Sequence, residues 1–394
     1  MAISRGRRNV IFLVLCQAFA MTGNSLVGVT SALVGHALLV DKAFATLPLG
    51  LQFLATMCST IPASYLMRRI GRRAGFLIGA AVGALGASIS ATAILASSFA
   101  GFVAGSMITG VFFAFVLFFR FAAAEAADPA FQGKAISLVL GGGVAAAVFG
   151  PSLAQWSKDM FEPIVFAGCY VVLVLLCLAT MATMSRIDIG RPGAAERDAA
   201  ARPLRAIVRQ PACWVAMLCG PISYGAMSLA MTATPLAMLA CGFDFPDTAF
   251  VIQWHQLGMF APSFVTGHLI ARFGLLNVMA FGGVLLAGSA AVNLSGVAFL
   301  NFWSGLLLLG VGWNFLFVGS TTLLTRAYRP SEKAKVQGVN DFLVFGTITA
   351  AALSSGALQH LLGWNAVNLG TIPLAGTALA AIIWLRAQRV PVAA

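Results

Sequence analysis

Long apolar stretches with almost no charge inside them constrain this chain more than any other feature. A helix needs about 20 predominantly apolar residues to cross the hydrocarbon core of a bilayer. Of the 394 residues, 60% are apolar and 9% are charged, whereas a soluble domain carries roughly 25% charged residues. A chain with so few charges lacks the residues to cover a water-exposed surface. The sequence therefore indicates a membrane protein.

The apolar stretches predict an all-α membrane protein with twelve transmembrane helices. The first stretch continues well past the length of a signal-peptide core, so we interpret it as a span rather than a cleaved leader. The predicted spans lie near residues 10–38, 46–67, 74–97, 99–124, 135–157, 162–184, 211–240, 247–271, 275–297, 299–325, 338–361 and 365–387.

Lys and Arg predict the orientation of these spans, because cytoplasmic loops are enriched in both. With both termini cytoplasmic, 21 of the 24 basic residues fall on the cytoplasmic side; Lys42 and Lys158 fall outside and Arg120 falls in a span. The net charge of +12 is therefore a topology signal, and we expect no nucleic-acid partner. The pattern predicts a multi-pass protein of a bacterial inner (plasma) membrane.

The longest polar stretch, residues 185–210, separates two sets of six spans. We expect an N-terminal bundle over 1–184, a cytoplasmic linker, and a C-terminal bundle over 211–394. The two halves also share a faint repeat, since Ser64–Gly71 and Gly267–Gly274 both have the pattern small-x-Leu-x-x-Arg-x-Gly, and their starts (64 and 267) lie 203 residues apart. Parallel halves of six spans are a known transporter architecture.

The segment from Ser64 to Arg73 resembles the loop 2–3 signature of the major facilitator superfamily, G-x-L-x-D-R-x-G-R-R. The segment matches the signature at Leu66, Arg69, Gly71, Arg72 and Arg73. It departs from the signature at Ser64, where Gly is usual, and at Arg68, where Asp is usual. With the six-plus-six layout and the linker, the resemblance extends over nearly the whole chain.

This resemblance implies alternating access around a cavity lined by spans 1, 4, 7 and 10, with a basic gate at the cytoplasmic side. Because Arg68 replaces the usual Asp, Asp341 in span 11 is a candidate for the missing negative charge, and Glu125 is a candidate partner of Arg72. Ordinary solvation at the membrane interface explains both carboxylates equally well. The gate residues that the resemblance implies are Arg69, Gly71, Arg72, Arg73, Glu125 and Arg272.

In span 5, Ala146-x-x-x-Gly150-Pro151-x-x-Ala154 resembles the antiporter-associated motif G-x-x-x-G-P-x-x-G-G, with Ala in place of Gly. Small residues let helices approach closely, and Pro bends a helix. The resemblance favours export over uptake by a small margin. A kinked, tightly packed helix is the alternative interpretation.

Arg120 is the one basic residue that falls inside a span, in a run of phenylalanines that includes Phe113. An ionisable residue in the membrane is a functional candidate because burying its charge is costly. The guanidinium is suited to an anionic or carbonyl-bearing substrate, since its donors form a fork. Alternatively, Arg120 extends to the interface or pairs with Glu125 or Asp341.

Polar and aromatic residues in three other spans complete the predicted substrate site. Gln17 and Asn24 lie seven residues apart in span 1 and share a helical face, which indicates either a cavity wall or interhelical packing. Tyr224 follows Gly220-Pro221, where we expect a broken helix, and Trp313-Asn314 lies at mid-depth in span 10. Aromatic faces and amides suit an amphipathic solute, although core packing is an equal alternative for Trp313.

His255 in span 8 and Asp341 are the candidates for proton coupling. Histidine changes charge near physiological pH, but a structural, hydrogen-bonded histidine is the competing interpretation. The first span has no carboxylate, which disfavours proton-driven export of organic cations. No P-loop is present, so ATP is not the energy source, and no Cys/His cluster or catalytic motif indicates a metal, a cofactor or an enzyme.

Together these features predict a monomeric, proton-coupled secondary transporter of a small organic solute, anionic or aromatic, that works in the lipid bilayer by alternating access. A non-transporting membrane sensor or partner protein with the same fold is the alternative function.

Overall fold

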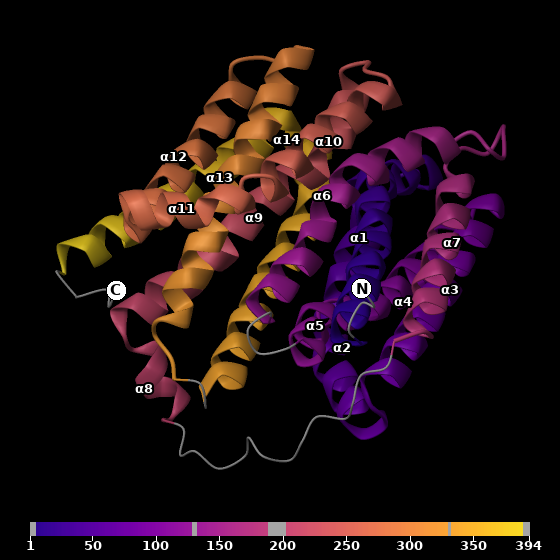
Figure 1. Ribbon diagram of the computed structural model, residues 1–394. Coiled ribbons are helices and arrows are strands. Elements are labelled where there is room, and N and C mark those ends of the chain that lie inside the picture. The colour runs from indigo at the N-terminus through magenta and orange to yellow at the C-terminus, as the bar shows by residue number, and fades with distance from the viewer. Residues whose placement is uncertain (1–4, 128–131, 188–201, 330–331, 389–394) are drawn as a thin grey trace. The chain divides into compact units, whose positions relative to one another are not determined.

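The structure is a computed structural model that describes residues 5–127, 132–187, 202–329 and 332–388. The chain divides into two compact units, Met1–Gly193 and Ala194–Ala394. All regular elements within the described ranges are helices, as Figure 1 shows. The all-α prediction is therefore confirmed.

The first unit contains seven α-helices and one short 3₁₀ helix among its described residues. They are α1 (Arg5–Leu38), η1 (Lys42–Phe44), α2 (Leu47–Ile70), α3 (Arg72–Leu95), α4 (Phe99–Val116), α5 (Phe119–Ala126), α6 (Gln132–Ser157) and α7 (Ala167–Met184).

The second unit contains seven α-helices among the residues that the structure describes. They are α8 (Leu204–Val208), α9 (Pro211–Ala240), α10 (Phe245–Phe260), α11 (Ser263–Phe273), α12 (Leu275–Leu294), α13 (Phe299–Thr325) and α14 (Lys333–Ala387).

Nine helices in the described ranges are long and apolar enough to cross a membrane. The predicted span 247–271 is divided into α10 and α11 at Pro262, which lacks the N–H that would continue the helical hydrogen bonds. The predicted spans 338–361 and 365–387 are joined in α14. The nine helices do not test the predicted count of twelve or the orientation of the termini.

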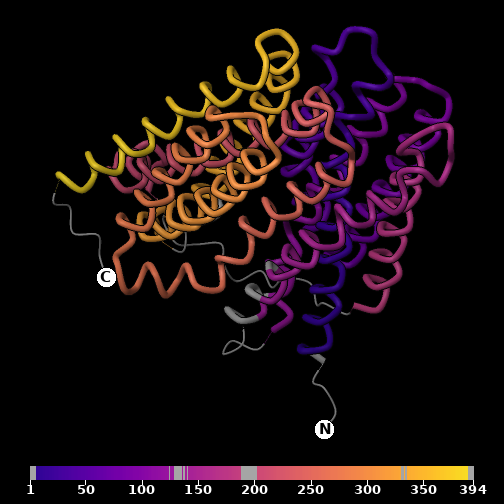
Figure 2. The backbone as a smooth tube through the Cα atoms, turned by 90° about the horizontal axis from the view of Figure 1, so that it is seen from above, coloured from indigo at the N-terminus to yellow at the C-terminus, as the bar shows by residue number. Residues whose placement is uncertain are grey.

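Helix α14 consists of two parts that run in opposite directions. Gly363 has a non-helical backbone within it (φ 78°, ψ 179°). Before Gly363, Asn340 lies against Gly220 and Ser355 donates to the carbonyl of Leu229, so this part runs parallel to α9. After it, Gly370 lies against Leu229 whereas Ala378 accepts a bond from Cys219, so this part runs antiparallel. Figure 2 shows the chain turning back within its yellow segment.

One local prediction in the spans is wrong, and another span contains an unexpected turn. We expected a break at Gly220-Pro221, but α9 continues as a helix through Pro221 and Pro235. The predicted span 99–124 agrees with the segment Phe99–Ala123, which is long and apolar enough to cross a membrane, although a turn at Leu117 and Phe118 within it separates α4 from α5. The break therefore lies immediately before Arg120, in the phenylalanine-rich segment.

The same set of helix pairs packs together in both units. In the first unit α1 packs on α6, α2 on α4, and α3 on α4 and α7. In the second unit α9 packs on the first part of α14, α10 on α13, and α12 on α13 and α14. This correspondence extends the faint sequence repeat to the packing of each unit.

Small residues allow the closest helix pairs to form. A Cβ added to Gly86 of α3 would lie 2.6 Å from the backbone nitrogen of Thr109 in α4, and one added to Gly282 of α12 would lie 2.7 Å from that of Leu316 in α13. No side chain fits at such distances, so the backbones of these pairs touch. Close approach through glycine is typical of helices in membranes.

The repeated sequence motif forms the same turn in both units. Gly71 between α2 and α3 has φ 93° and ψ 159°, and Gly274 between α11 and α12 has φ 87° and ψ 146°. Each donates its N–H to the carbonyl of the residue four positions earlier. Only glycine adopts this region of φ and ψ readily. The repeated motif therefore ends in a tight turn in both halves.

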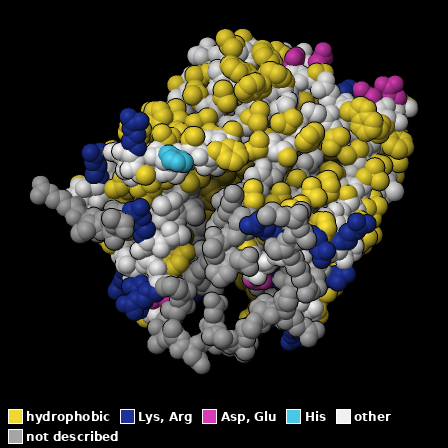
Figure 3. All heavy atoms as spheres, in the orientation of Figure 1, with side chains coloured by type: hydrophobic (Ala, Val, Ile, Leu, Met, Phe, Trp, Pro, Cys, Tyr) yellow, Lys and Arg dark blue, Asp and Glu magenta, His cyan; other side chains and the backbone are white. Residues whose placement is uncertain are grey.

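Apolar side chains are spread over much of the upper and right-hand parts of the face seen in Figure 3, whereas Lys and Arg lie mainly along its left edge and across its lower half. Large exposed hydrophobic residues occur along the outer sides of the helices, including Leu175 (59% exposed), Phe281 (54%) and Ile383 (63%). Apolar surface on this scale is costly in water and suits a lipid environment.

Candidate functional site

Arg120 lies at the start of α5, next to the buried aromatic residue Phe119. Phe119 is fully buried and its ring meets that of Phe76 edge-on at 4.9 Å, which fixes α5 against α3. The guanidinium of Arg120 lies over the ring of Phe121, 4.8 Å from its centroid. Its Nε is buried and has no hydrogen-bond partner among the described residues. A half-buried cation with an unused donor is suited to binding an acceptor on a solute.

Glu125 pairs with Arg72 rather than with Arg120. Nη2 of Arg72 donates to Oε1 of Glu125 at 2.7 Å, and Nε donates to Oε2 at 3.1 Å. The guanidinium of Arg72 also lies over the ring of Phe118, 5.7 Å from its centroid. This fork-shaped pair joins the start of α3 to the end of α5. The pairing is as the sequence predicts, and its role as a gate stays a prediction.

The other basic residues of the repeated motif differ in their surroundings. Arg73 donates to the backbone carbonyl of Ser185 after α7, and Arg69 is exposed. In the second unit, Arg272 is exposed and lies over the ring of Phe273, 5.3 Å from its centroid. Of the six predicted gate residues, the structure brings Arg72 and Glu125 into direct contact.

The two polar residues predicted for the wall of the first span lie in different surroundings. Gln17 is 9% exposed and lies beside Gly142 of α6, and its Oε1 has no hydrogen-bond partner within the described ranges. Asn24 is half-buried. Next to it, Ser25 occupies the space that a side chain at Gly150 would need, with Oγ 2.2 Å from the added Cβ. Gly150 of the antiporter-like motif therefore allows close packing of α6 against α1.

Phe113 lies in α4 with 7% of its surface exposed, and its ring meets that of Phe112 at a centroid distance of 5.3 Å. Phe112 in turn fills the space beside Gly83 of α3. Phe113 is therefore a buried neighbour of Phe112, the residue of α4 that packs on α3.

In the second unit, an aromatic cluster forms between α9, α10 and α13. Trp313 stacks on Phe317 with ring centroids 5.1 Å apart and planes 16° apart. Tyr224 meets both rings edge-on, at 5.0 Å from Trp313 and 4.8 Å from Phe317. Phe260 meets Trp313 at 6.2 Å. We call these four residues the aromatic cluster.

Two methionines complete the surroundings of the aromatic cluster. Met227 and Met259 are each 8% exposed and pack against Trp313, which is 4% exposed. Thioethers adapt their shape to aromatic rings. The indole Nε1 of Trp313 is buried and has no hydrogen-bond partner in the described part of the chain. The cluster thus combines flat apolar faces with one unused donor.

Asn314 has an internal role in the structure. Its Oδ1 accepts a bond from Thr266 Oγ1 at 2.6 Å, and its Nδ2 donates to the carbonyl of Met259 at 2.7 Å and to Ser263 Oγ at 2.6 Å. These bonds join α13 to both sides of the α10–α11 break. Since Asn314 is fully buried and both ends of its amide are bonded, it holds the bent helix in place beside the cluster.

His255 is fully buried in α10, and its Nδ1 lies 2.8 Å from the carbonyl oxygen of Leu306 in α13. Because a carbonyl only accepts, Nδ1 carries the proton in this arrangement. Its Nε2 has no hydrogen-bond partner among the residues described. A fixed tautomer with an unused lone pair is compatible with either a structural role or proton exchange.

Asp341 is half-buried near the start of α14. Its Oδ1 lies 3.5 Å from Nδ2 of Asn340, at the long limit for a hydrogen bond. His255 lies on α10 and Asp341 on α14, so the two predicted coupling residues belong to different helices of the second unit.

Four residues around Trp313 were not expected from the sequence: Phe260, Phe317, Met227 and Met259. The spacing of four residues between Trp313 and Phe317 places both on one helical face and was the available signal. The described residues contain no group of three or more His, Cys, Asp or Glu that would hold a metal ion.

The family model described as Major Facilitator Superfamily matches residues 13–351. A riboflavin transporter, RfnT, of Brucella anthropi is 39% identical over 380 residues, which is 96% of this chain and 95% of that protein. An uncharacterized MFS-type transporter, YdeG, of Bacillus subtilis is 27% identical over 97% of this chain and 93% of its own length. The crystal structure of the human organic anion transporter MFSD10 superposes with a TM-score of 0.68 at 16% identity, covering 97% of this chain and all of that one.

Proposed function

The chain belongs to the major facilitator superfamily and is a membrane transporter rather than an enzyme, and from this premise we propose that its solute is a flavin such as riboflavin. The aromatic cluster around Trp313 is the observation that carries the proposal. A related transporter, 39% identical over nearly its whole length, is named for riboflavin.

The chemistry of the solute suits the residues of the cluster. A flavin has a flat, fused ring system with polar edges, so its faces stack on aromatic side chains while its edges accept or donate hydrogen bonds. Trp313, Tyr224 and Phe317 offer aromatic surfaces, and Nε1 of Trp313 offers a buried donor. Arg120, Gln17, Asn24 and Phe113 are the contacts that we propose in the first unit.

We further propose that the transporter has twelve spans in two six-span bundles with cytoplasmic termini, as a monomer in a bacterial inner membrane. Alternating access is driven by protons, with His255 and Asp341 as the coupling residues. The resemblance of the Ala146–Ala154 segment to an antiporter motif favours export.

Binding and flux of riboflavin test the proposed function together. We expect riboflavin to raise the melting temperature of the detergent-purified protein, and to cross the membrane of proteoliposomes that contain it. Adenosine, which has a flat ring system of a different shape and a ribose, is the control solute. Absence of both the shift and the flux would reject the flavin proposal.

Three extensions of the same assay address direction, coupling and the alternative function. Flux in right-side-out and inside-out vesicles distinguishes export from uptake. Flux that does not respond to an imposed pH gradient would contradict proton coupling. Binding of riboflavin without any flux would instead favour a membrane sensor with the same fold.

A further inference from the structure

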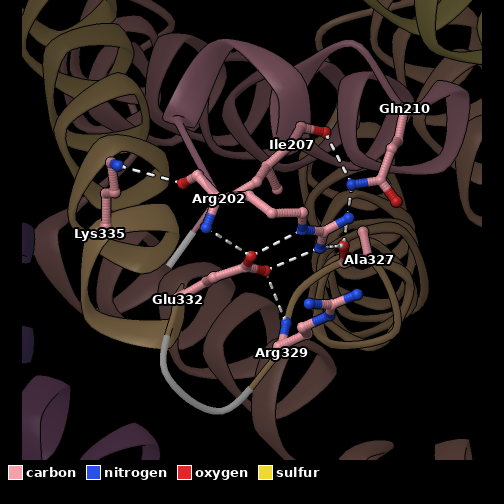
Figure 4. A network of polar contacts seen from close by, with 7 residues as sticks. All are labelled: Arg202, Ile207, Gln210, Ala327, Arg329, Glu332 and Lys335. Carbon is pink, nitrogen blue, oxygen red and sulfur yellow. Dashed lines mark hydrogen bonds and ion pairs between the residues drawn. The ribbon is translucent and has the colours of Figure 1, made fainter. Parts of the chain in front are cut away.

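Glu332 has a buried carboxylate in the second unit that lies outside the proposed solute site. It immediately precedes α14, and its side chain is fully buried. Figure 4 shows that the side chain of Arg202 and the backbone of Arg329 both point toward this carboxylate. Burial of an unpaired carboxylate is very costly, so the partners of this group decide whether it is stable.

Both carboxylate oxygens of Glu332 are fully used. Oε1 accepts from Nε of Arg202 at 2.6 Å and from the backbone N–H of Arg202 at 3.1 Å. Oε2 accepts from Nη2 of Arg202 at 2.7 Å and from the backbone N–H of Arg329 at 2.9 Å. Arg202 thus binds the carboxylate with two guanidinium nitrogens and with its own backbone N–H. Fork-shaped, charge-assisted bonds of this kind are strong and specific in geometry.

Further contacts attach residues 202–210 to the chain around the end of α13 and the start of α14. Nζ of Lys335 donates to the carbonyl of Arg202 at 3.3 Å, and Nε2 of Gln210 donates to the carbonyl of Ala327 at 3.1 Å. Ile207 of α8 is fully buried in the apolar core of the second unit, which also contains Ala327 and Val336. Residues 202–210 are therefore attached to the second unit at three places along their length.

This attachment lies at a particular point of the chain. Residues 202–210 form the last part of the stretch that leads from the first unit to α9, and the sequence predicted the whole stretch as a linker. Within residues 202–210, Arg202 comes first in the chain and precedes both α8 and α9. Since Glu332 binds Arg202, a displacement of Arg202 would act on the residues between α13 and α14.

We propose that the Arg202–Glu332 pair is a conformational anchor that makes α8 a fixed part of the second unit and transmits displacement of Arg202 to α13 and α14 during transport. The part of the proposal that concerns turnover rests on the proposed function. The part that concerns the anchoring of α8 does not, because it is measurable without any solute.

Tryptic cleavage of α8 tests the anchoring. Arg205 and Arg209 are exposed, and neither precedes proline, so cleavage after them reports how often this segment opens. Glu332→Gln leaves the Arg202 fork without a charged partner, and we expect cleavage to accelerate about tenfold or more because proteolysis follows the population of the open form. Arg202→Lys keeps the charge but loses the fork, and we expect an intermediate rate. This second variant carries the test if Glu332→Gln does not fold.

Arg326→Gln is the matched control. It removes a positive charge close to the same turn, and the exposed Arg326 side chain makes no ion pair within the described ranges. We expect its cleavage rate to match that of the unaltered protein. Cleavage that stays unchanged in Glu332→Gln and Arg202→Lys, or that accelerates equally in Arg326→Gln, would overturn the anchoring.

Riboflavin flux in proteoliposomes tests the consequence for transport. We expect the maximal rate of the anchor variants to fall about tenfold while KM changes less than about twofold, because the anchor acts on a conformational step and not on binding. Faster cleavage with an unchanged maximal rate would overturn the link to transport. Lack of riboflavin flux in the unaltered protein would contradict the proposed function instead. The cleavage rates would then still test the anchoring of α8.

Discussion

Buried polar groups without an internal partner mark the residues of this protein that are most open to a ligand. Most buried polar atoms in proteins are hydrogen-bonded, and those of Asn314 are bonded at both ends of its amide. Nε of Arg120 and Nε1 of Trp313, in contrast, have no hydrogen-bond partner among the residues that the structure describes. An unused donor at a buried position favours a solute that supplies an acceptor.

Trp313→Phe removes the indole donor and retains an aromatic ring beside Phe317. If Nε1 donates to the solute, riboflavin should bind about tenfold more weakly, as expected for loss of one hydrogen bond of about 1.4 kcal/mol. Titration of the purified variant gives the dissociation constant.

Trp364→Phe is the control for this substitution. Trp364 is also buried (6% exposed) with an unpartnered Nε1 inside the described region, but it packs on Phe302 away from the aromatic cluster. Equal losses of affinity in the two variants would show that the effect is one of packing.

Arg120→Gln tests the cation at the start of α5. If the guanidinium binds the solute, this variant should lose affinity for riboflavin phosphate more than for riboflavin, because the phosphate carries the charge that Arg binds most strongly. The ratio of the two dissociation constants is the measurement. Parallel losses for both solutes, or loss of folded protein, would contradict a direct contact with charge.

Helices in this protein end and bend where the backbone chemistry requires it. Gly71 and Gly274 allow the tight turns between helices, and Pro262 marks the bend between α10 and α11. The bend is then held by a side chain on another helix, since Asn314 of α13 bonds to Met259 and Ser263 on its two sides. Local signals therefore place the bend, and a tertiary contact stabilises it.

Gly71→Ala and Gly274→Ala should destabilise the protein by similar amounts, about 1–3 kcal/mol each, because both positions have the same glycine-only backbone conformation. Melting temperatures of the purified variants measure this. Gly376→Ala is the control, since an added Cβ meets nothing within 4 Å there and the backbone is helical. A harmless Gly274→Ala beside a damaging Gly71→Ala would contradict the equivalence of the two turns.

At the scale of the whole molecule, the two units repeat one scheme of helix packing, and each adds its own ionic contact. The first unit joins α3 to α5 through Arg72 and Glu125, whereas the second joins the segment before α8 to the α13–α14 turn through Arg202 and Glu332. These contacts differ in burial, since the Glu125 side chain is 34% exposed and that of Glu332 is fully buried. The more buried pair is expected to resist salt better.

The pH dependence of the second contact has a definite sign. The hydrogen bonds from Arg202 lower the pKa of Glu332 from 4.5 to about 2, and those from the backbone of Arg329 and Arg202 act in the same direction. A lowered carboxyl pKa stabilises the folded state above pH 4.5, and this stabilisation is lost as the pH falls toward 2. Glu332→Gln should therefore lower the melting temperature by the same amount at pH 5.5 and pH 8. A smaller loss of melting temperature at pH 5.5 than at pH 8 would contradict a Glu332 that stays ionised at both values.

Apolar length and basic residues by themselves determined that the chain is an all-α membrane protein, and the segment from Ser64 to Arg73 pointed to its superfamily. These properties are readable because they depend on residues that are close in sequence. Only the tertiary structure placed Phe260 and Tyr224 beside Trp313, used both ends of Asn314 to hold a bent helix, and brought Arg202 to Glu332, 130 residues away. Such contacts depend on which helices meet. Helix meetings are set by many small packing interactions spread along the chain, and no short pattern in the sequence records them.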